Sequence, residues 1–168
     1  MTDTAGVSLR RTATLPGTLD MAGIGTPCGL KPEMEREQLR HLTKKHSFIG
    51  KARYRRTIDI PKQLAGKPLR VKLERVLWRS TMSIDGHDTG QTQESLVAPH
   101  IFHIKDGLTE GRHEITLDID NRQIYRISNG MAHAYTDETQ TKWNGVLGEM
   151  TLEAEPLITD VKVMEDAA

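Results

Sequence analysis

Alternation of apolar and polar residues with a period of two is the sequence feature that most restricts how this 168-residue chain can fold. Residues 69–73 and 115–119 show it most clearly. Because successive side chains of a β-strand point to opposite faces, each segment predicts a strand with one buried face. Further segments of this kind are residues 54–60, 81–85, 101–104, 146–153 and 158–163. The alternation therefore predicts about seven short strands.

Turn signals separate these segments and indicate how the strands connect. They are residues 61–66 and the pairs Asp85-Gly86, Asp106-Gly107, Glu110-Gly111 and Asn129-Gly130. Strands that follow one another without helices between them favour antiparallel pairing. We therefore expect an all-β fold, an antiparallel β-sandwich of the jelly-roll type.

One short helix is expected for residues 33–42, across one end of the sandwich. Pro32 precedes it, and Glu33, Glu35 and Glu37 lie in its first turns, where the helix dipole favours negative charge. The preceding residues 15–30 are rich in Gly, Pro and Thr and predict an irregular loop.

Charge and cysteine content exclude several classes of function. The chain has 23 Lys plus Arg and 23 Asp plus Glu, so no net charge attracts nucleic acid or an anionic membrane. Cys28 is the only cysteine, which excludes an internal disulfide and a thiolate metal cluster. No apolar stretch has the length of a signal peptide core or a membrane span. We expect neither a cofactor nor a metal site, because the seven histidines have no ligand spacing.

Residues 131–148 are the segment most suited to binding chemistry. They combine amides, hydroxyls, two carboxylates and two aromatic rings without a regular period. Such groups suit sugars, because hydroxyls need paired polar partners and an aromatic ring covers the apolar face of a pyranose. The alternative is that Trp143 is a core residue and that Thr139, Gln140 and Asn144 satisfy loop backbone. Spacing alone does not decide between them.

The order of the segments resembles the N-terminal galactose-binding-like domain of glycoside hydrolase family 2, which contains β-galactosidases, β-glucuronidases and β-mannosidases. The matching pieces lie between residues 15 and 154: LPGTLDMAGIG, GKARYRRTIDIP, GKPLRVKLERVLWRSTMSIDGHDTG, QESLVAPHIFHI, LTEGRHEITLDIDN and AYTDETQTKWNGVLGEMTLEA. The resemblance implies a sugar-binding sandwich that precedes an immunoglobulin-like domain and a catalytic barrel. It implies that this chain is non-catalytic and is part of a longer glycosidase.

Two motifs of that family can be placed on this chain. The hairpin motif is matched by Asp85 and Gly86 with Gly90 after them, and these residues are expected to be structural. The late motif Trp143-Asn144-Gly145 follows a loop that in relatives helps to line the sugar subsite. Relatives often have an Asp six residues before that Gly, where this chain has Thr139, so the direct carboxylate contact is in doubt. The galactosidase and glucuronidase alternatives both stay open.

The resemblance therefore names candidate residues for two roles. Those expected to bind substrate are Asp137, Glu138, Thr139, Gln140 and Asn144. Of these, Glu138, Gln140 and Asn144 are expected to be directed away from the core. Trp143, expected to be mostly buried, and Gly145 are expected to be structural. No catalytic residue is expected, because a glycosidase needs two carboxylates across a sugar cleft and nothing in the chain predicts such a pair.

The expected organisation has three parts: an irregular or strand-like segment 1–14, the sugar-binding domain 15–156, and a final strand with the start of a linker at 157–168. The expected partners are a β-glycoside carbohydrate and the remaining domains of the parent glycosidase, with neither nucleic acid nor membrane. The parent is expected to be bacterial, either periplasmic or secreted. A free-standing carbohydrate-binding module and a purely structural interaction domain are the alternatives. The sequence leaves open the sugar, the linkage, the oligomeric state and a structural calcium ion.

Overall fold

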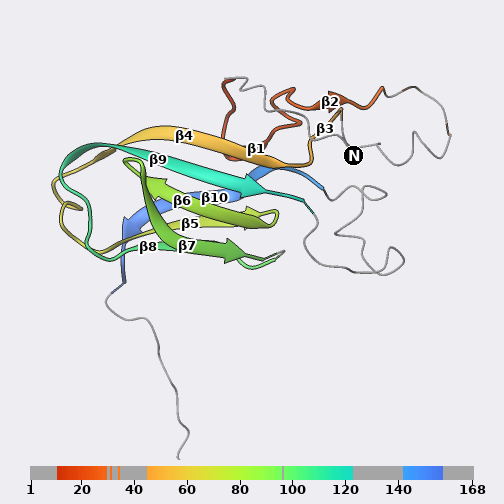
Figure 1. The fold of residues 1–168 in the computed structure, drawn as a ribbon. Coiled ribbons are helices and arrows are strands. Elements are labelled where there is room, and N and C mark those ends of the chain that lie inside the picture. Colours follow the sequence, from red (N-terminus) through yellow and green to blue (C-terminus); the bar gives the residue numbers. More distant parts are fainter. Residues whose placement is uncertain are drawn as a thin grey trace, which may run out of the picture.

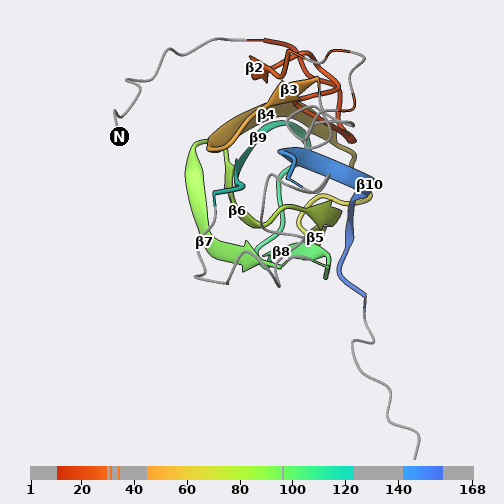
Figure 2. The same cartoon turned by 90° about the vertical axis from the view of Figure 1, so that its right-hand side faces the viewer.

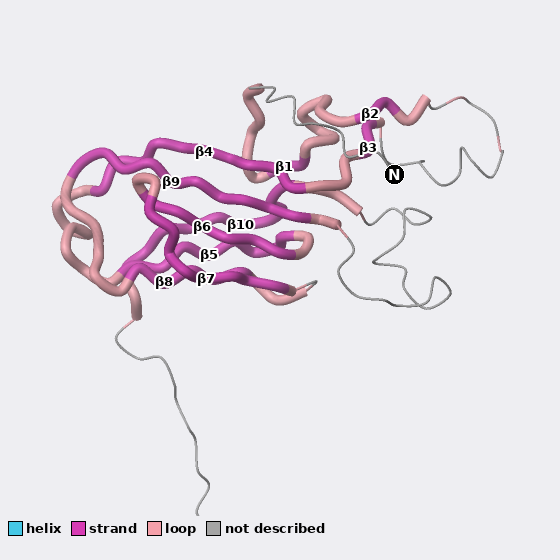
Figure 3. The backbone as a smooth tube through the Cα atoms, viewed as in Figure 1, coloured by secondary structure: helices cyan, strands magenta, loops and turns pink. Residues whose placement is uncertain are grey.

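The computed structural model describes residues 11–29, 31, 34, 45–95, 97–122 and 142–156. These residues form antiparallel strands and no helix (Figures 1 and 3). The short strands are β1 (Gly17–Thr18), β2 (Thr26–Pro27) and β3 (His46–Ser47). The longer ones are β4 (Lys51–Ile60), β5 (Leu69–Val76), β6 (Arg79–Ile84), β7 (His87–Glu94), β8 (His100–Ile104), β9 (Gly111–Asp120) and β10 (Gly145–Ala154).

Two four-stranded sheets face each other and form the sandwich (Figure 2). One sheet has the order β1-β10-β5-β8 and the other has the order β4-β9-β6-β7. A small two-stranded sheet, β2-β3, lies beyond one end of the sandwich. The predicted all-β antiparallel sandwich is thus confirmed.

The core lies between the sheets and contains the apolar residues that the alternation predicts. Leu69, Val71 and Leu73 of β5 are buried against Leu117 and Ile119 of β9 in one cluster. The outer faces carry charge instead, since each strand sends its alternate residues outward. Asp118 on β9, for example, accepts two hydrogen bonds from Arg53 on β4, with N–O distances of 2.7 and 2.8 Å.

One side of the sandwich is closed by contact between β7 and β8 rather than by a backbone ladder. The Gln91 side chain on β7 makes this contact with the backbone of His103 on β8. Its Nε2 donates to the His103 carbonyl at 2.7 Å, and its Oε1 accepts from the His103 N–H at 2.9 Å. A side-chain amide thus takes the place of a paired strand residue and ties the two sheets together.

The expected strand at 158–163 falls outside the described residues, and so does the expected helix at 33–42 except for Met34. Within the described residues, the sequence prediction missed one long strand, β7. Its sequence, HDTGQTQE, contains no large apolar residue, because this edge strand buries no apolar face. The alternation of apolar residues therefore gave no signal for it.

Candidate functional site

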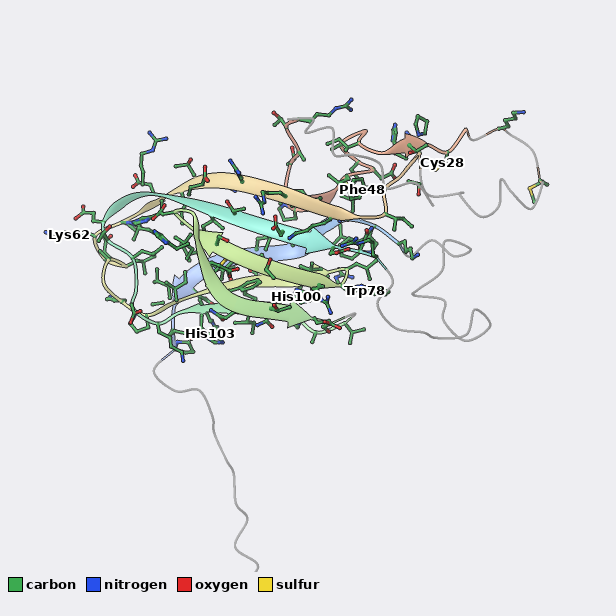
Figure 4. All side chains as sticks on the ribbon, viewed as in Figure 1. Cys28, Phe48, Lys62, Trp78, His100 and His103 are labelled. Atoms are coloured by element: carbon green, nitrogen blue, oxygen red, sulfur yellow. The ribbon has the colours of Figure 1, made fainter. Side chains whose placement is uncertain are left out.

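The candidate sugar-binding loop leaves and re-enters the sandwich at one end. Asp137, Glu138, Thr139 and Gln140 lie in residues 123–141, which are outside the described part of the chain. The residues on either side are described, and β9 ends where β10 begins, at the right-hand end in Figure 1. Phe48 and Trp78 lie at this same end, whereas Lys62 lies at the opposite end (Figure 4). The site is therefore built from the two stems of this loop.

Asn144 holds the stem that leads into β10. It is 2% exposed, and its Nδ2 donates to the carbonyls of Gly50 and Ile119 at 3.3 and 3.2 Å. Its Oδ1 accepts from the Tyr54 hydroxyl at 2.7 Å. The expectation that Asn144 points away from the core is therefore wrong. Its amide satisfies backbone carbonyls that would otherwise be buried without a donor.

Asn121 holds the other stem, directly after β9, and is fully buried. Its Oδ1 accepts from the Gly50 N–H at 2.8 Å, and its Nδ2 donates to the carbonyls of Phe48 and Trp143 at 2.8 and 3.0 Å. The bond to Trp143 connects the two stems directly. We call Tyr54, Asn121 and Asn144 the stem clamp. Sequence reasoning missed Asn121, since a polar residue that ends an alternating strand looks like the start of an exposed turn.

Two tryptophans and a glycine complete the stems. Trp78 is 1% exposed, and its Nε1 donates to the Arg122 carbonyl at 2.8 Å, just before the loop. Trp143 is half-buried, which is less burial than we expected. Gly145 is buried with a φ of 138°, and a Cβ atom there would lie 2.2 Å from the Gly17 carbonyl oxygen of β1. Only glycine fits at this crossing of β1 and β10.

Near the stems, the aspartates are favoured in their ionised form and Tyr54 in its neutral form. The pKa of Asp120 is lowered, mainly by hydrogen bonds from the Arg122 side chain. The pKa of Asp118 is lowered mainly by Arg53. Burial raises the pKa of Tyr54, so its hydroxyl stays protonated as the donor to Asn144. None of these groups has the raised carboxyl pKa that a general acid requires.

Ser80 and His100 form a buried pair that resembles part of a nucleophilic site. The Ser80 Oγ lies 2.6 Å from the His100 Nδ1, and each residue is 1% exposed. Burial lowers the pKa of His100, so the imidazole is favoured in its neutral form. Because no substrate can reach a pair this deeply buried, the pair stabilises the fold between β6 and β8.

The residues of the hairpin motif lie at the far end of the sandwich, between β6 and β7. Asp85 and Gly86 form the turn with φ values of 50° and 80°, and Gly90 in β7 has a φ of 69°. The Asp85 carboxylate lies 2.6 Å from His113 Nδ1 and accepts from the Glu114 N–H at 2.8 Å. These contacts fasten the turn to β9. The pKa of Asp85 is lowered, first by the Glu114 bond and then by His113.

Neither a metal site nor a membrane span is found in the described ranges. No group of three or more His, Cys, Asp or Glu side chains is arranged there to hold an ion. None of the described segments forms a helix that is long and apolar enough to cross a bilayer.

The described strands and buried asparagines define a class: a jelly-roll-like antiparallel sandwich domain in which Asn121, after β9, bonds to Trp143, before β10, at one end of the sandwich. No family model and no curated protein matches the chain. Among solved structures, it is similar to a glycoside hydrolase family 2 β-galacturonidase from Eisenbergiella tayi, with a TM-score of 0.56 and 18% identity over 91% of this chain. It is also similar to an FMN-binding β-glucuronidase from Faecalibacterium prausnitzii, with a TM-score of 0.56 and 20% identity over 88% of this chain.

The matched regions are a small part of those enzymes. The chain covers 22% of the β-galacturonidase and 19% of the β-glucuronidase. The fold is thus the fold of one domain within each of these larger glycosidases, as the sequence motifs predicted.

Proposed function

We propose that this chain is a non-catalytic carbohydrate-recognition domain of a family 2 glycoside hydrolase, with residues 123–141 forming part of the sugar-subsite wall. The stem clamp carries the proposal. A loop that supplies polar groups to a sugar must enter and leave its scaffold at fixed points, since misplaced groups lose binding energy. Two buried asparagines that bond across the stems meet this requirement.

Carboxylate and amide groups in the loop provide the chemistry. Asp137, Glu138 and Gln140 offer acceptors and donors for sugar hydroxyls, and Thr139 adds a hydroxyl. Asn144 is the anchor of this loop rather than a ligand, because its amide already bonds to the sandwich. The parent enzyme would act on a β-glycoside, and the similarity to two uronidases favours the glucuronidase-type alternative over the galactosidase.

The absence of catalysis is part of the proposal. Retaining and inverting glycosidases use one carboxylic acid of raised pKa and one carboxylate facing it across the sugar. The described carboxyl groups with shifted pKa values, Asp85, Asp118 and Asp120, are all shifted downward by hydrogen bonds. We therefore expect no hydrolysis of nitrophenyl β-glucuronide, β-galacturonide or β-galactoside by the isolated chain. Turnover that disappears when one of its carboxylates is mutated would contradict the proposal.

Sugar binding is tested on the same chain by NMR titration with glucuronate and galactose. We expect weak saturable binding in the millimolar range, because one wall of a subsite supplies only part of the contacts. Glu138→Ala or Gln140→Ala should reduce it at unchanged melting temperature, whereas the exposed Glu110→Ala at the far end of the sandwich should not. If the wild type shows no saturable shift, or if both loop variants bind like the wild type, the sugar-binding role is wrong.

A further inference from the structure

A second feature of the molecule lies along the side of the sandwich opposite the β7–β8 contact. A cavity of about 590 Å³ opens there between the sheets, along β4 and β10. Its floor is formed by core residues that include Val71, Leu73, Met82 and Leu117. We call it the seam cavity. Its size lies within the range of small-molecule pockets.

The mouth of the seam cavity is apolar as well. Ile58 on β4 and Met150 and Leu152 on β10 line it, and all three are only partly buried. In the described part of the chain, no strand pairs with the free edge of β4, and β1 covers β10 only at Gly145 and Val146. Residues 11–15 also line the cavity. Residues 11–15 therefore form part of the border of the opening.

Arginines surround this apolar mouth. Arg55 and Arg56 are adjacent on the edge strand β4, so their side chains leave opposite faces of the sheet. Both are exposed, and neither has an ion-pair partner within the described residues. Arg11 adds a third guanidinium, which donates to the Gly23 carbonyl at 3.5 Å. Positive charge that has no ion-pair partner among the described residues, beside an apolar pocket, favours a ligand that has an apolar body and an anionic end.

We propose that the seam cavity binds an amphipathic carboxylate of the fatty-acid type. Its hydrocarbon chain lies between the sheets, and its carboxylate is bound at the mouth by Arg56, which leaves the same face of β4 as the cavity-lining Tyr54 and Ile58. A sugar fits poorly, because its hydroxyls would face an apolar floor without hydrogen-bond partners. A second copy that paired through β4 would bring the two arginine-rich edges together, and like charges there would repel. An added peptide strand is less favoured because residues 11–15 already border the opening.

Fluorescence titration with 11-(dansylamino)undecanoic acid tests the proposal on the whole chain. We expect saturable binding at one site, competition by dodecanoate, and at least tenfold weaker competition by dodecan-1-ol. Added NaCl should weaken binding of the carboxylate, because the arginine contacts are solvent-exposed. Absence of saturable binding, or equal competition by the alcohol, would overturn the proposal.

Paired variants identify the site. Arg56→Gln should weaken binding at least tenfold, whereas Lys67→Gln removes one exposed cation outside the cavity and should leave binding unchanged. Leu152→Trp should fill the mouth and abolish binding, and cooperative unfolding of this variant shows that it still folds. Wild-type affinity in the arginine variant would overturn the proposal. So would displacement of the probe by an alternating Val-Glu peptide but not by dodecanoate, since the site would then accept an added strand.

Discussion

Two buried asparagines determine where the candidate loop begins and ends. Asn121 and Asn144 use their amides to satisfy backbone groups of residues 48–50, Ile119 and Trp143, which belong to separate parts of the chain. The Tyr54 hydroxyl adds a bond to Asn144 from β4. Because every partner is remote in sequence, these residues act as long-range connections rather than as local turn residues.

The first prediction concerns this stem clamp. Asn144→Ala should lower the free energy of unfolding by about 1–3 kcal/mol for each buried group left without a partner, and Asn121→Ala should act similarly. Tyr54→Phe removes one hydroxyl and should cost about 1 kcal/mol. Urea denaturation measures all three. The control is Gln63→Ala, which removes an exposed amide outside the clamp. Full stability of both asparagine variants would show that the clamp does not hold the stems.

The second prediction concerns pH, through His113 and Asp85. His113 Nδ1 lies 2.6 Å from the Asp85 carboxylate, and Nε2 lies 3.0 Å from the Thr109 carbonyl. Both ring nitrogens face acceptors, so the imidazolium fits best, and the pKa of His113 is raised, mainly by Asp85. A raised folded pKa stabilises the protein fully below the unfolded value of 6.5, and this contribution is lost as pH rises through the folded pKa.

His113→Asn should therefore destabilise the protein most between about pH 4 and 6.5 and progressively less above that range. At lower pH the contribution also falls, as Asp85, whose pKa is lowered, becomes protonated. His100 acts in the opposite sense: its pKa is lowered by burial, so stability decreases as pH falls below 6.5, and this decrease should persist in the variant. Urea unfolding across pH measures these trends in the wild type and in His113→Asn. If the difference in unfolding free energy between the wild type and His113→Asn does not vary with pH, the protonated His113 does not stabilise the fold through Asp85.

At the scale of elements, β10 depends on one glycine where it meets β1. The φ of Gly145 is 138°, and a Cβ atom would lie 2.2 Å from the Gly17 carbonyl oxygen. Gly111, at the start of β9, is a matched control, because its φ is 110° but its Cβ position is open. Comparing alanine substitutions at these two glycines therefore separates the free-energy cost of backbone strain from the cost of the contact between the added Cβ atom and β1.

The third prediction follows. Gly111→Ala should cost about 1–2 kcal/mol from backbone conformation alone. Gly145→Ala should cost a further 1–3 kcal/mol or so, because the backbone of β1 must move away. Thermal unfolding of both variants measures the difference. If both variants lose the same unfolding free energy, β1 moves away from residue 145 without cost and does not fix the stem.

The element scale also shows what could be predicted from the sequence. Strands β4, β5, β6, β8, β9 and β10 bury one apolar face, so local alternation revealed them. Strand β7 has polar residues on both faces and gave no such signal. The burial of Asn144 could not be predicted for a related reason. An amide in a polar motif looks the same whether its partner is a ligand or a backbone carbonyl ninety residues away.

At the scale of the molecule, the resemblance found in short ordered motifs and the similarity in fold agree, although overall identity to the solved structures is only 18–20%. The agreement is understandable, because the turn glycines and the alternation each have local physical causes. The candidate ligands Asp137, Glu138, Thr139 and Gln140 lie outside the described residues. For these residues the sequence predicts which hydrogen-bonding groups are present, but it does not predict where their side chains lie.

Because of the Gln91 bridge, the two sheets are joined differently along the two sides of the sandwich. The bridge joins β7 to β8 through both atoms of one amide, whereas on the other side the described residues link β4 to the start of β10 at the loop end, through the hydrogen bond from Tyr54 to Asn144. We therefore expect the distance between the two sheets to vary least beside Gln91 and beside the stem clamp. We expect it to vary most at the end of the seam cavity that lies away from the stem clamp, so that the width of the pocket changes there.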